Sequence, residues 1–331
     1  MERFALAAAV VLGFALTAAL CSLFVPLRRV LERREQQQQP VQSEQPRPAP
    51  LRAPLWGGLC AAAGTVAAVG VGWLAACVGQ PELLGSEGQL MTRLLTALAG
   101  SLAFGAVGLA EDVARMRSPA ALGLRRDVRL LLEALAAAFV LLLLRAAGCL
   151  PRGLGVPGAG YVLLGSAVPF LWAVLMVALA ECARIAERDE GTVCGAAFVA
   201  MLALMMVEAG LGVFGLAVLP AALAGALVAL GLWAFPPARL GVGCCGSLLA
   251  AGAIGCIPLS LDMTSLTVPL ALPFWAAGGL LAAQLLCAKR TGKPLRCWVK
   301  KHKMSPETVF LCSFALSAVG YVLALALLRW C

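Results

Sequence analysis

Charged residues are scarce in this sequence. Asp, Glu, Lys and Arg make up 13% of the 331 residues, about half of the roughly 25% that is usual in soluble domains. Hydrophobic residues make up 61%, and the mean hydropathy is +0.91. This composition excludes an ordinary soluble domain and indicates an integral membrane protein.

Histidine and paired cysteine motifs are also rare. The sequence holds one histidine, and none of its 13 cysteines belongs to a CxxC motif. Most of the cysteines lie inside apolar runs, where a free thiol behaves as a small hydrophobic side chain. We therefore expect neither a disulfide framework nor a cysteine-based zinc site.

Long apolar runs make up most of the sequence. The first run lacks a small-residue cleavage pattern and is long enough to span a bilayer, so we expect it to remain as a membrane helix. Cutting the chain at its charges gives ten predicted spans: Ala5 to Val25, Ala53 to Pro81, Leu94 to Ala110, Val128 to Ala147, Gly153 to Ala180, Gly191 to Val207, Ala209 to Ala238, Leu240 to Leu261, Met263 to Ala288 and Thr308 to Leu328. The fourth is the weakest, because it carries Glu133.

These spans predict an all-α, polytopic membrane protein with about ten transmembrane helices, forming one integral membrane domain over residues 1–331. The loops that follow the odd-numbered spans hold 21 of the 26 Lys and Arg residues. Because positive charge in short loops favours the cytoplasm, both termini are predicted outside a cell (inner or plasma) membrane. The net charge of +9 therefore reflects membrane orientation, and no nucleic-acid partner is expected.

One segment has low complexity. Residues 35–50 read EQQQQPVQSEQPRPAP and follow the first span. This Gln- and Pro-rich composition predicts a flexible cytoplasmic loop.

Two acidic clusters follow predicted spans on the cytoplasmic side. Glu111 and Asp112 follow directly on the third span, with Arg115 one helical turn beyond Glu111. Adjacent carboxylates could hold Mg²⁺, and a nearby cation could meet a diphosphate. The alternative is a solvated helix end in which Glu111 and Arg115 pair at i,i+4.

The second cluster follows the fifth span and mixes acids with arginines. Its members are Glu181, Arg184, Glu187, Arg188, Asp189 and Glu190. Pairs such as Glu181 with Arg184 predict a self-neutralised loop. A third polar stretch, Lys289 to Lys303, carries seven cations that could anchor the topology or bind lipid phosphates.

The segment at residues 104–133 reads FGAVGLAEDVARMRSPAALGLRRDVRLLLE. It resembles the third cytoplasmic segment of phospho-N-acetylmuramoyl-pentapeptide transferases and related polyprenyl-phosphate sugar-1-phosphate transferases, the MraY/WecA-like family. That family has the pattern DDxxK, a spacer, and then GLS-x-RQK-LLLQ. Glu111 and Asp112 take the places of the paired Asp, and Arg115 takes the place of the Lys.

Three further matches occur in the family's order. APLWGG at 53–58 is similar to TPTMGG, GCCGS at 243–247 to GDTGS, and TGKPL at 291–295 to TGKRI. The resemblance covers essentially the whole chain and implies a ten-helix fold with both termini outside.

The resemblance also implies a function. It implies transfer of a phospho-sugar from a UDP-sugar to undecaprenyl phosphate, in the synthesis of lipid-linked peptidoglycan (cell-wall) or surface glycan precursors, with Mg²⁺ as cofactor if the protein is active and none otherwise. Asp112, Glu111 and Arg115 would be the catalytic residues, with Asp112 and Glu111 as metal ligands. Glu187, Lys293 and His302 would bind substrate.

The departures from the family pattern concern the same chemistry. The Asp of GDTGS, the family's third metal-ligand position, is Cys244, and a thiol is a poor ligand for a hard cation. The family's N-x-x-N-x-x-D-G element aligns with Glu181, Arg184, Glu187 and Arg188. Its HHH loop is reduced to Lys301, His302 and Lys303. These changes predict a divergent family member with weak or no catalysis.

Two other interpretations remain. One is a non-catalytic scaffold or regulator, a possible pseudoenzyme acting as a homodimer or with an active paralogue in a lipid-linked glycan pathway. The other is a transporter, which the near absence of ionisable residues at mid-span disfavours. The expected partners are the lipid bilayer and, for an active enzyme, undecaprenyl phosphate and a UDP-sugar.

Overall fold

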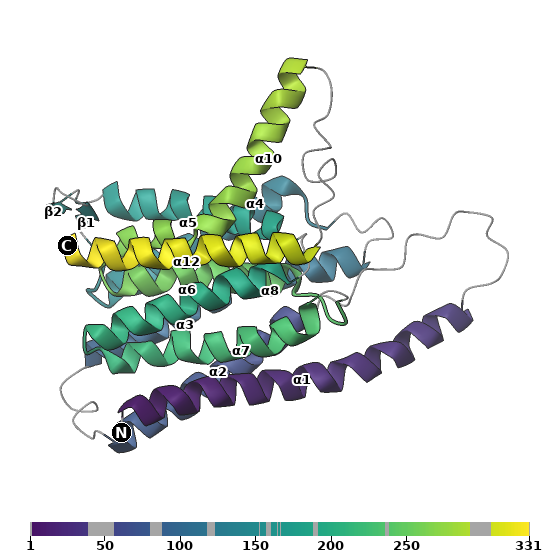
Figure 1. Ribbon diagram of the computed structural model, residues 1–331, viewed down its shortest axis with the longest axis horizontal. Helices are drawn as coiled ribbons and strands as arrows, with labels where there is room; N and C mark the ends of the chain where they lie inside the picture. Colours follow the sequence, from purple (N-terminus) through teal and green to yellow (C-terminus); the bar gives the residue numbers. More distant parts are fainter. Residues whose placement is uncertain are drawn as a thin grey trace.

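The computed structural model is a helical bundle (Figure 1). It describes residues 2–38, 56–79, 88–117, 123–151, 153–156, 160–163, 165, 167–187, 191–235, 238–291 and 306–330. Its long helices are α1 (Glu2–Gln38), α2 (Gly57–Gly79), α3 (Gly88–Arg117), α4 (Arg126–Ala146), α5 (Ala167–Ala186), α6 (Thr192–Gly210), α7 (Phe214–Ala234), α8 (Gly243–Ser260), α10 (Leu272–Thr291) and α12 (Pro306–Trp330). The short helices η2 (Thr264–Leu266) and α9 (Thr267–Leu270) lie between α8 and α10.

Eight of the described helices are long and apolar enough to cross a membrane, which makes the chain a multi-pass membrane protein. A ninth span is formed if η2 and α9 are taken together with α10, from which they are bent by 64°. The remaining long helix, α4, is too charged to qualify by composition, because Arg129, Glu133 and Arg145 lie within it. The fourth predicted span, the weakest of the ten, therefore does not qualify as a membrane span by composition.

The segment predicted as the fifth span is only partly helical. Its first part forms a two-stranded antiparallel hairpin of β1 (Gly153–Val156) and β2 (Gly160–Leu163). Helix α5 begins at Ala167. Assigning β1 and β2 to a helical span was wrong, because an apolar composition does not distinguish short glycine-containing strands from the start of a helix.

The structure describes only the first residues of the Gln- and Pro-rich segment. Helix α1 continues to Gln38, so the first four of residues 35–50 are helical. The other residues of the predicted flexible loop lie outside the described residues. Figure 1 shows α1 extending well beyond the other helices at this end.

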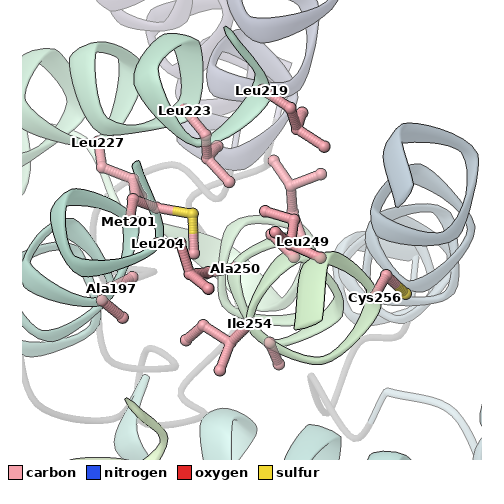
Figure 2. Close-up of a cluster of buried hydrophobic side chains, with 14 of the residues drawn as sticks. Ala197, Met201, Leu204, Leu219, Leu223, Leu227, Leu249, Ala250, Ile254 and Cys256 are labelled. Carbon is pink, nitrogen blue, oxygen red and sulfur yellow. The ribbon is translucent and has the colours of Figure 1, made fainter. Parts of the chain in front are cut away.

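Helix α8 forms the centre of the bundle. All 18 of its residues are buried, and it packs against α2, α3, α5 and α6. In Figure 2, Leu249, Ala250 and Ile254 of α8 face Met201 and Leu204 of α6, with Leu223 of α7 beside them. Helix α12, by contrast, lies at the periphery with most of its side chains exposed.

Small residues allow this central packing. Backbones can approach closely only where no side chain intervenes. A Cβ on Gly108 of α3 would lie 2.2 Å from the carbonyl oxygen of Cys244. A Cβ on Gly58 of α2 would lie 2.1 Å from the nitrogen of Gly246. The glycines of the family-like motifs therefore bring α2 and α3 against the first turn of α8.

Candidate functional site

The first turn of α8 is capped by a carboxylate from α3. Asp112 lies one helical turn beyond Gly108, and only 1% of its surface is exposed. The backbone N–H of Cys244 donates to Oδ1 of Asp112 at 3.0 Å, and the N–H of Cys245 donates to Oδ2 at 2.9 Å. A helix N-terminus has unpaired N–H groups and a partial positive charge, so a carboxylate there is stabilising. Both oxygens of Asp112 thus serve the α3–α8 contact.

The neighbouring carboxylate of Glu111 binds arginine instead. Its Oε1 lies 2.8 Å from Nη2 of Arg115 and 3.6 Å from Nη1 of Arg129. The other oxygen, Oε2, is buried and has no hydrogen-bond partner. The predicted i,i+4 pairing of Glu111 with Arg115 is confirmed.

Arg115 links Glu111 to the turn after α5. Its second terminal nitrogen, Nη1, lies 3.6 Å from Oε2 of Glu187. Gly123 has a φ of 70° and packs beside this arginine, where a Cβ would lie 3.1 Å from Cγ of Arg115. Glycine tolerates this left-handed conformation without strain, so the backbone at Gly123 can lie against the arginine side chain.

Glu187 also contacts the thiol at the substituted family position. The Sγ of Cys244 lies 3.7 Å from Oε2 of Glu187, with the thiol as donor. Burial raises the pKa of Glu187, while Arg115 and the Cys244 thiol oppose that rise. Where the family pattern places a carboxylate, this chain has a weak donor that faces another acid.

A second group of ion pairs joins α4 to α5. Nε of Arg129 donates to Oε1 of Glu181 at 2.7 Å, and Nη2 of Arg184 lies 2.6 Å from Oε2 of the same residue. The predicted pairing of Glu181 with Arg184 is therefore confirmed. Glu133 is fully buried beside this group, with its Oε1 3.9 Å from Nε of Arg129 and neither oxygen hydrogen-bonded.

The role of α4 does not follow from the sequence pattern. From the sequence, Arg129 counts among the cytoplasmic loop cations, and Glu133 weakens the fourth predicted span. Their i,i+4 spacing was the available signal, because ionisable groups within an apolar helix usually pair with each other or with neighbouring helices. In the structure both side chains are buried against the site rather than exposed to lipid.

Comparison with known protein families identifies the chain. Residues 94–262, slightly more than half of the sequence, match the family described as glycosyl transferase family 4. The match runs from α3 to α8 and includes Glu111, Asp112, Glu187 and Cys244. The chain belongs to glycosyl transferase family 4. A comparison with curated protein sequences gives no significant match.

Membership of family 4 confirms the MraY/WecA-like resemblance. The family comprises polyprenyl-phosphate sugar-1-phosphate transferases, and its members typically use Mg²⁺. The chain is therefore a membrane protein of a lipid-phosphate sugar transferase family.

The polar side chains of this family-4 chain do not fit a Mg²⁺ ion. Mg²⁺ requires oxygen ligands in nearly octahedral geometry at about 2.0–2.1 Å. Here Asp112 and Glu111 bind different partners, and the third family position offers the thiol of Cys244. No group of three His, Cys, Asp or Glu residues in the described part of the chain is arranged to hold a metal ion. The guanidinium groups of Arg115 and Arg129 contact Glu111, and the N-terminus of α8 binds Asp112.

Several predicted site residues are brought together and others are not described. Glu111, Asp112, Arg115, Glu187 and Cys244 form one continuous set of contacts. Lys293 and His302 lie outside the described residues, as do Arg188, Asp189 and Glu190. The grouping therefore joins α3, the turn after α5 and the start of α8.

Proposed function

We propose that this chain is a divergent polyprenyl-phosphate sugar-1-phosphate transferase that keeps the family's membrane fold and has weak or no transferase activity. The pathway would be the synthesis of lipid-linked precursors of the cell wall or of a surface glycan. The contact between Cys244 and Glu187 carries this proposal, because a buried thiol stands where the family pattern has a carboxylate.

The electrostatics of the site support the same conclusion. Among the described residues, each acid next to Cys244 has a partner: Asp112 caps α8, while Glu111 and Glu187 face Arg115. Removing a single preorganised electrostatic contact can lower a catalytic rate by about 10²- to 10³-fold. Several such changes meet here, so the chemistry of the family is expected to be strongly weakened.

The proposed arrangement in the membrane has ten crossings, with α4 as the fourth and the bent η2, α9 and α10 as the ninth. Figure 1 shows the start of α1 and the end of α12 at the same end of the bundle, which supports an even number of crossings. The pairing of Arg129 and Glu133 inside the protein supports α4 as a span, because their charges do not face lipid. The distribution of Lys and Arg supports both termini outside the cell membrane.

If the protein has no transferase activity, the retained fold would have a non-catalytic role. A bundle that keeps its central helix contacts while its site is neutralised by ion pairs would serve as a membrane scaffold or regulator in a lipid-linked glycan pathway. A UDP-sugar and undecaprenyl phosphate would be its substrates only if residual activity is present.

Release of UMP tests the proposal. The purified full chain in detergent is given Mg²⁺, undecaprenyl phosphate and either UDP-MurNAc-pentapeptide or UDP-GlcNAc, with an active family transferase as a positive control. We expect either no UMP above the protein-free blank or release at least about 10²-fold slower than by the positive control. UMP release as fast as by the positive control, which disappears in Asp112→Asn but persists in the exposed-site control Asp127→Asn, would overturn the proposal.

A further inference from the structure

The place of Arg115 between two acids suggests what stabilises this site without a metal. The carboxylates of Glu111 and Glu187 come from α3 and from the turn after α5, so they are brought together only by the fold. One terminal nitrogen of Arg115 faces each of them, at 2.8 Å and 3.6 Å. The guanidinium thus bridges two acids at positions where the family pattern has the first Asp of DDxxK and the Asp of N-x-x-N-x-x-D-G.

Without this cation the two acids would repel each other in a poorly solvated place. The side chain of Glu111 is 3% exposed and that of Glu187 is 13% exposed, so water screens their charges weakly. A divalent ion can bridge such a pair, and so can a planar guanidinium with several donors. The two occupants exclude each other, because both are cations that need the same oxygens.

A second arginine reinforces the exclusion. Nη1 of Arg129 lies 3.6 Å from the same Oε1 of Glu111 that binds Arg115. A metal ion at this oxygen would therefore lie against two guanidinium groups. The only unoccupied oxygen of the pair on α3 is Oε2 of Glu111, which is buried.

We propose that the guanidinium of Arg115 is the permanent counter-cation of this site, filling the position between Glu111 and Glu187 that a divalent cation would need, so that the protein does not bind Mg²⁺ there. This inference deepens the proposed function and rests on the same family assignment. Gly123 leaves room for this side chain, because a Cβ at position 123 would lie 3.1 Å from Cγ of Arg115.

Binding of Mn²⁺, followed by its electron paramagnetic resonance signal, tests the inference on the full chain in detergent. We expect the wild-type protein to bind no Mn²⁺ that excess Mg²⁺ can displace, and its melting temperature to be the same in EDTA and in Mg²⁺. Arg115→Ala removes the cation between Glu111 and Glu187 and leaves Arg129 beside Glu111. It should bind Mn²⁺ at least about tenfold more tightly than wild type. The double variant Arg115→Ala, Cys244→Asp adds a third carboxylate and should bind more tightly still.

Arg117→Ala is the matched control, because Arg117 lies on the same last turn of α3 and is exposed. It removes one positive charge without freeing the carboxylates, so it should behave as wild type. Displaceable Mn²⁺ binding by the wild-type protein, or equal behaviour of Arg115→Ala and Arg117→Ala, would overturn the inference.

The wild-type measurement decides the question even if Arg115→Ala does not fold. The two proposals also fail in different ways. UMP release that continues in EDTA contradicts the proposed loss of activity and leaves the role of Arg115 intact. UMP release that requires Mg²⁺, together with Mn²⁺ binding by the wild-type protein, contradicts both.

Discussion

The backbone N–H of Cys244 donates a hydrogen bond to Oδ1 of Asp112, and 132 positions of sequence separate the two residues. The contact joins the end of α3 to the start of α8, the most buried helix of the bundle. It uses the backbone of residue 244 rather than its side chain. The cap therefore persists although the side chain at 244 has changed from the family's carboxylate to a thiol.

Asp112→Asn should destabilise the protein by about 0.5–2 kcal/mol, the range for a helix N-terminus that loses a side-chain acceptor. The amide keeps one oxygen but turns its NH₂ group toward the second backbone N–H, which is then unpaired. A lower melting temperature in detergent is the expected result. The control Asp127→Asn, at an exposed position, should change stability by no more than about 0.5 kcal/mol. Equal shifts for the two variants would contradict the cap.

Gly108→Ala should separate α3 from α8. The new Cβ would lie 2.2 Å from the carbonyl oxygen of Cys244, so the helices must move apart, and overpacking of this kind costs about 1–3 kcal/mol. Gly70→Ala provides the comparison, because nothing lies within 4 Å of its Cβ and alanine favours helix. Thermal unfolding should show loss for Gly108→Ala and no loss for Gly70→Ala. A tolerated Gly108→Ala would show that the close approach is not required.

The two glutamates beside Arg129 should respond differently to neutralisation. Glu181→Gln weakens charge-assisted hydrogen bonds to both Arg129 and Arg184, and we expect a loss of about 1.5–3 kcal/mol. Glu133→Gln removes a buried carboxyl that accepts no hydrogen bond, so stability should stay the same or rise. Melting temperatures of the two variants measure the difference. Greater damage from Glu133→Gln would show that Glu133 is the essential partner of Arg129.

Glu187 should make stability depend on pH. Because burial raises its pKa in the folded protein above the ordinary value of 4.5, the folded state holds more protons than the unfolded state just above that pH. Its contribution to stability therefore falls as pH rises from about 4.5 through the folded pKa and is constant above it. Comparing melting temperature against pH for wild type and Glu187→Gln tests this. An unchanged pH profile in the variant would rule out Glu187 as the source.

Much of the helical arrangement follows from sequence alone. The apolar runs and their breaks predicted where the helices lie, and eight of them are long and apolar enough to cross a membrane. Burial of backbone groups in lipid requires helices or closed sheets, so hydropathy is a strong guide. Composition could not reveal the β1–β2 hairpin, nor the 64° bend before α10, since both depend on local backbone packing.

The candidate site was predicted in its residue types and only partly in its contacts. Pairs within one helix, Glu111 with Arg115 and Glu181 with Arg184, follow from i,i+4 and i,i+3 spacing and were confirmed. Contacts between helices do not follow from spacing. Arg129 meets Glu181 across 52 positions, and no local pattern encodes that distance.

The sequence by itself determined that this protein is an apolar bundle of membrane helices with its acids near helix ends, because those properties depend on composition and local periodicity. Only the tertiary structure decided what each acid does. Asp112 caps α8, Glu111 and Glu187 share Arg115, and Cys244 faces an acid rather than completing a carboxylate set. Which charge meets which is set by how closely the glycines of α2, α3 and α8 let their backbones approach.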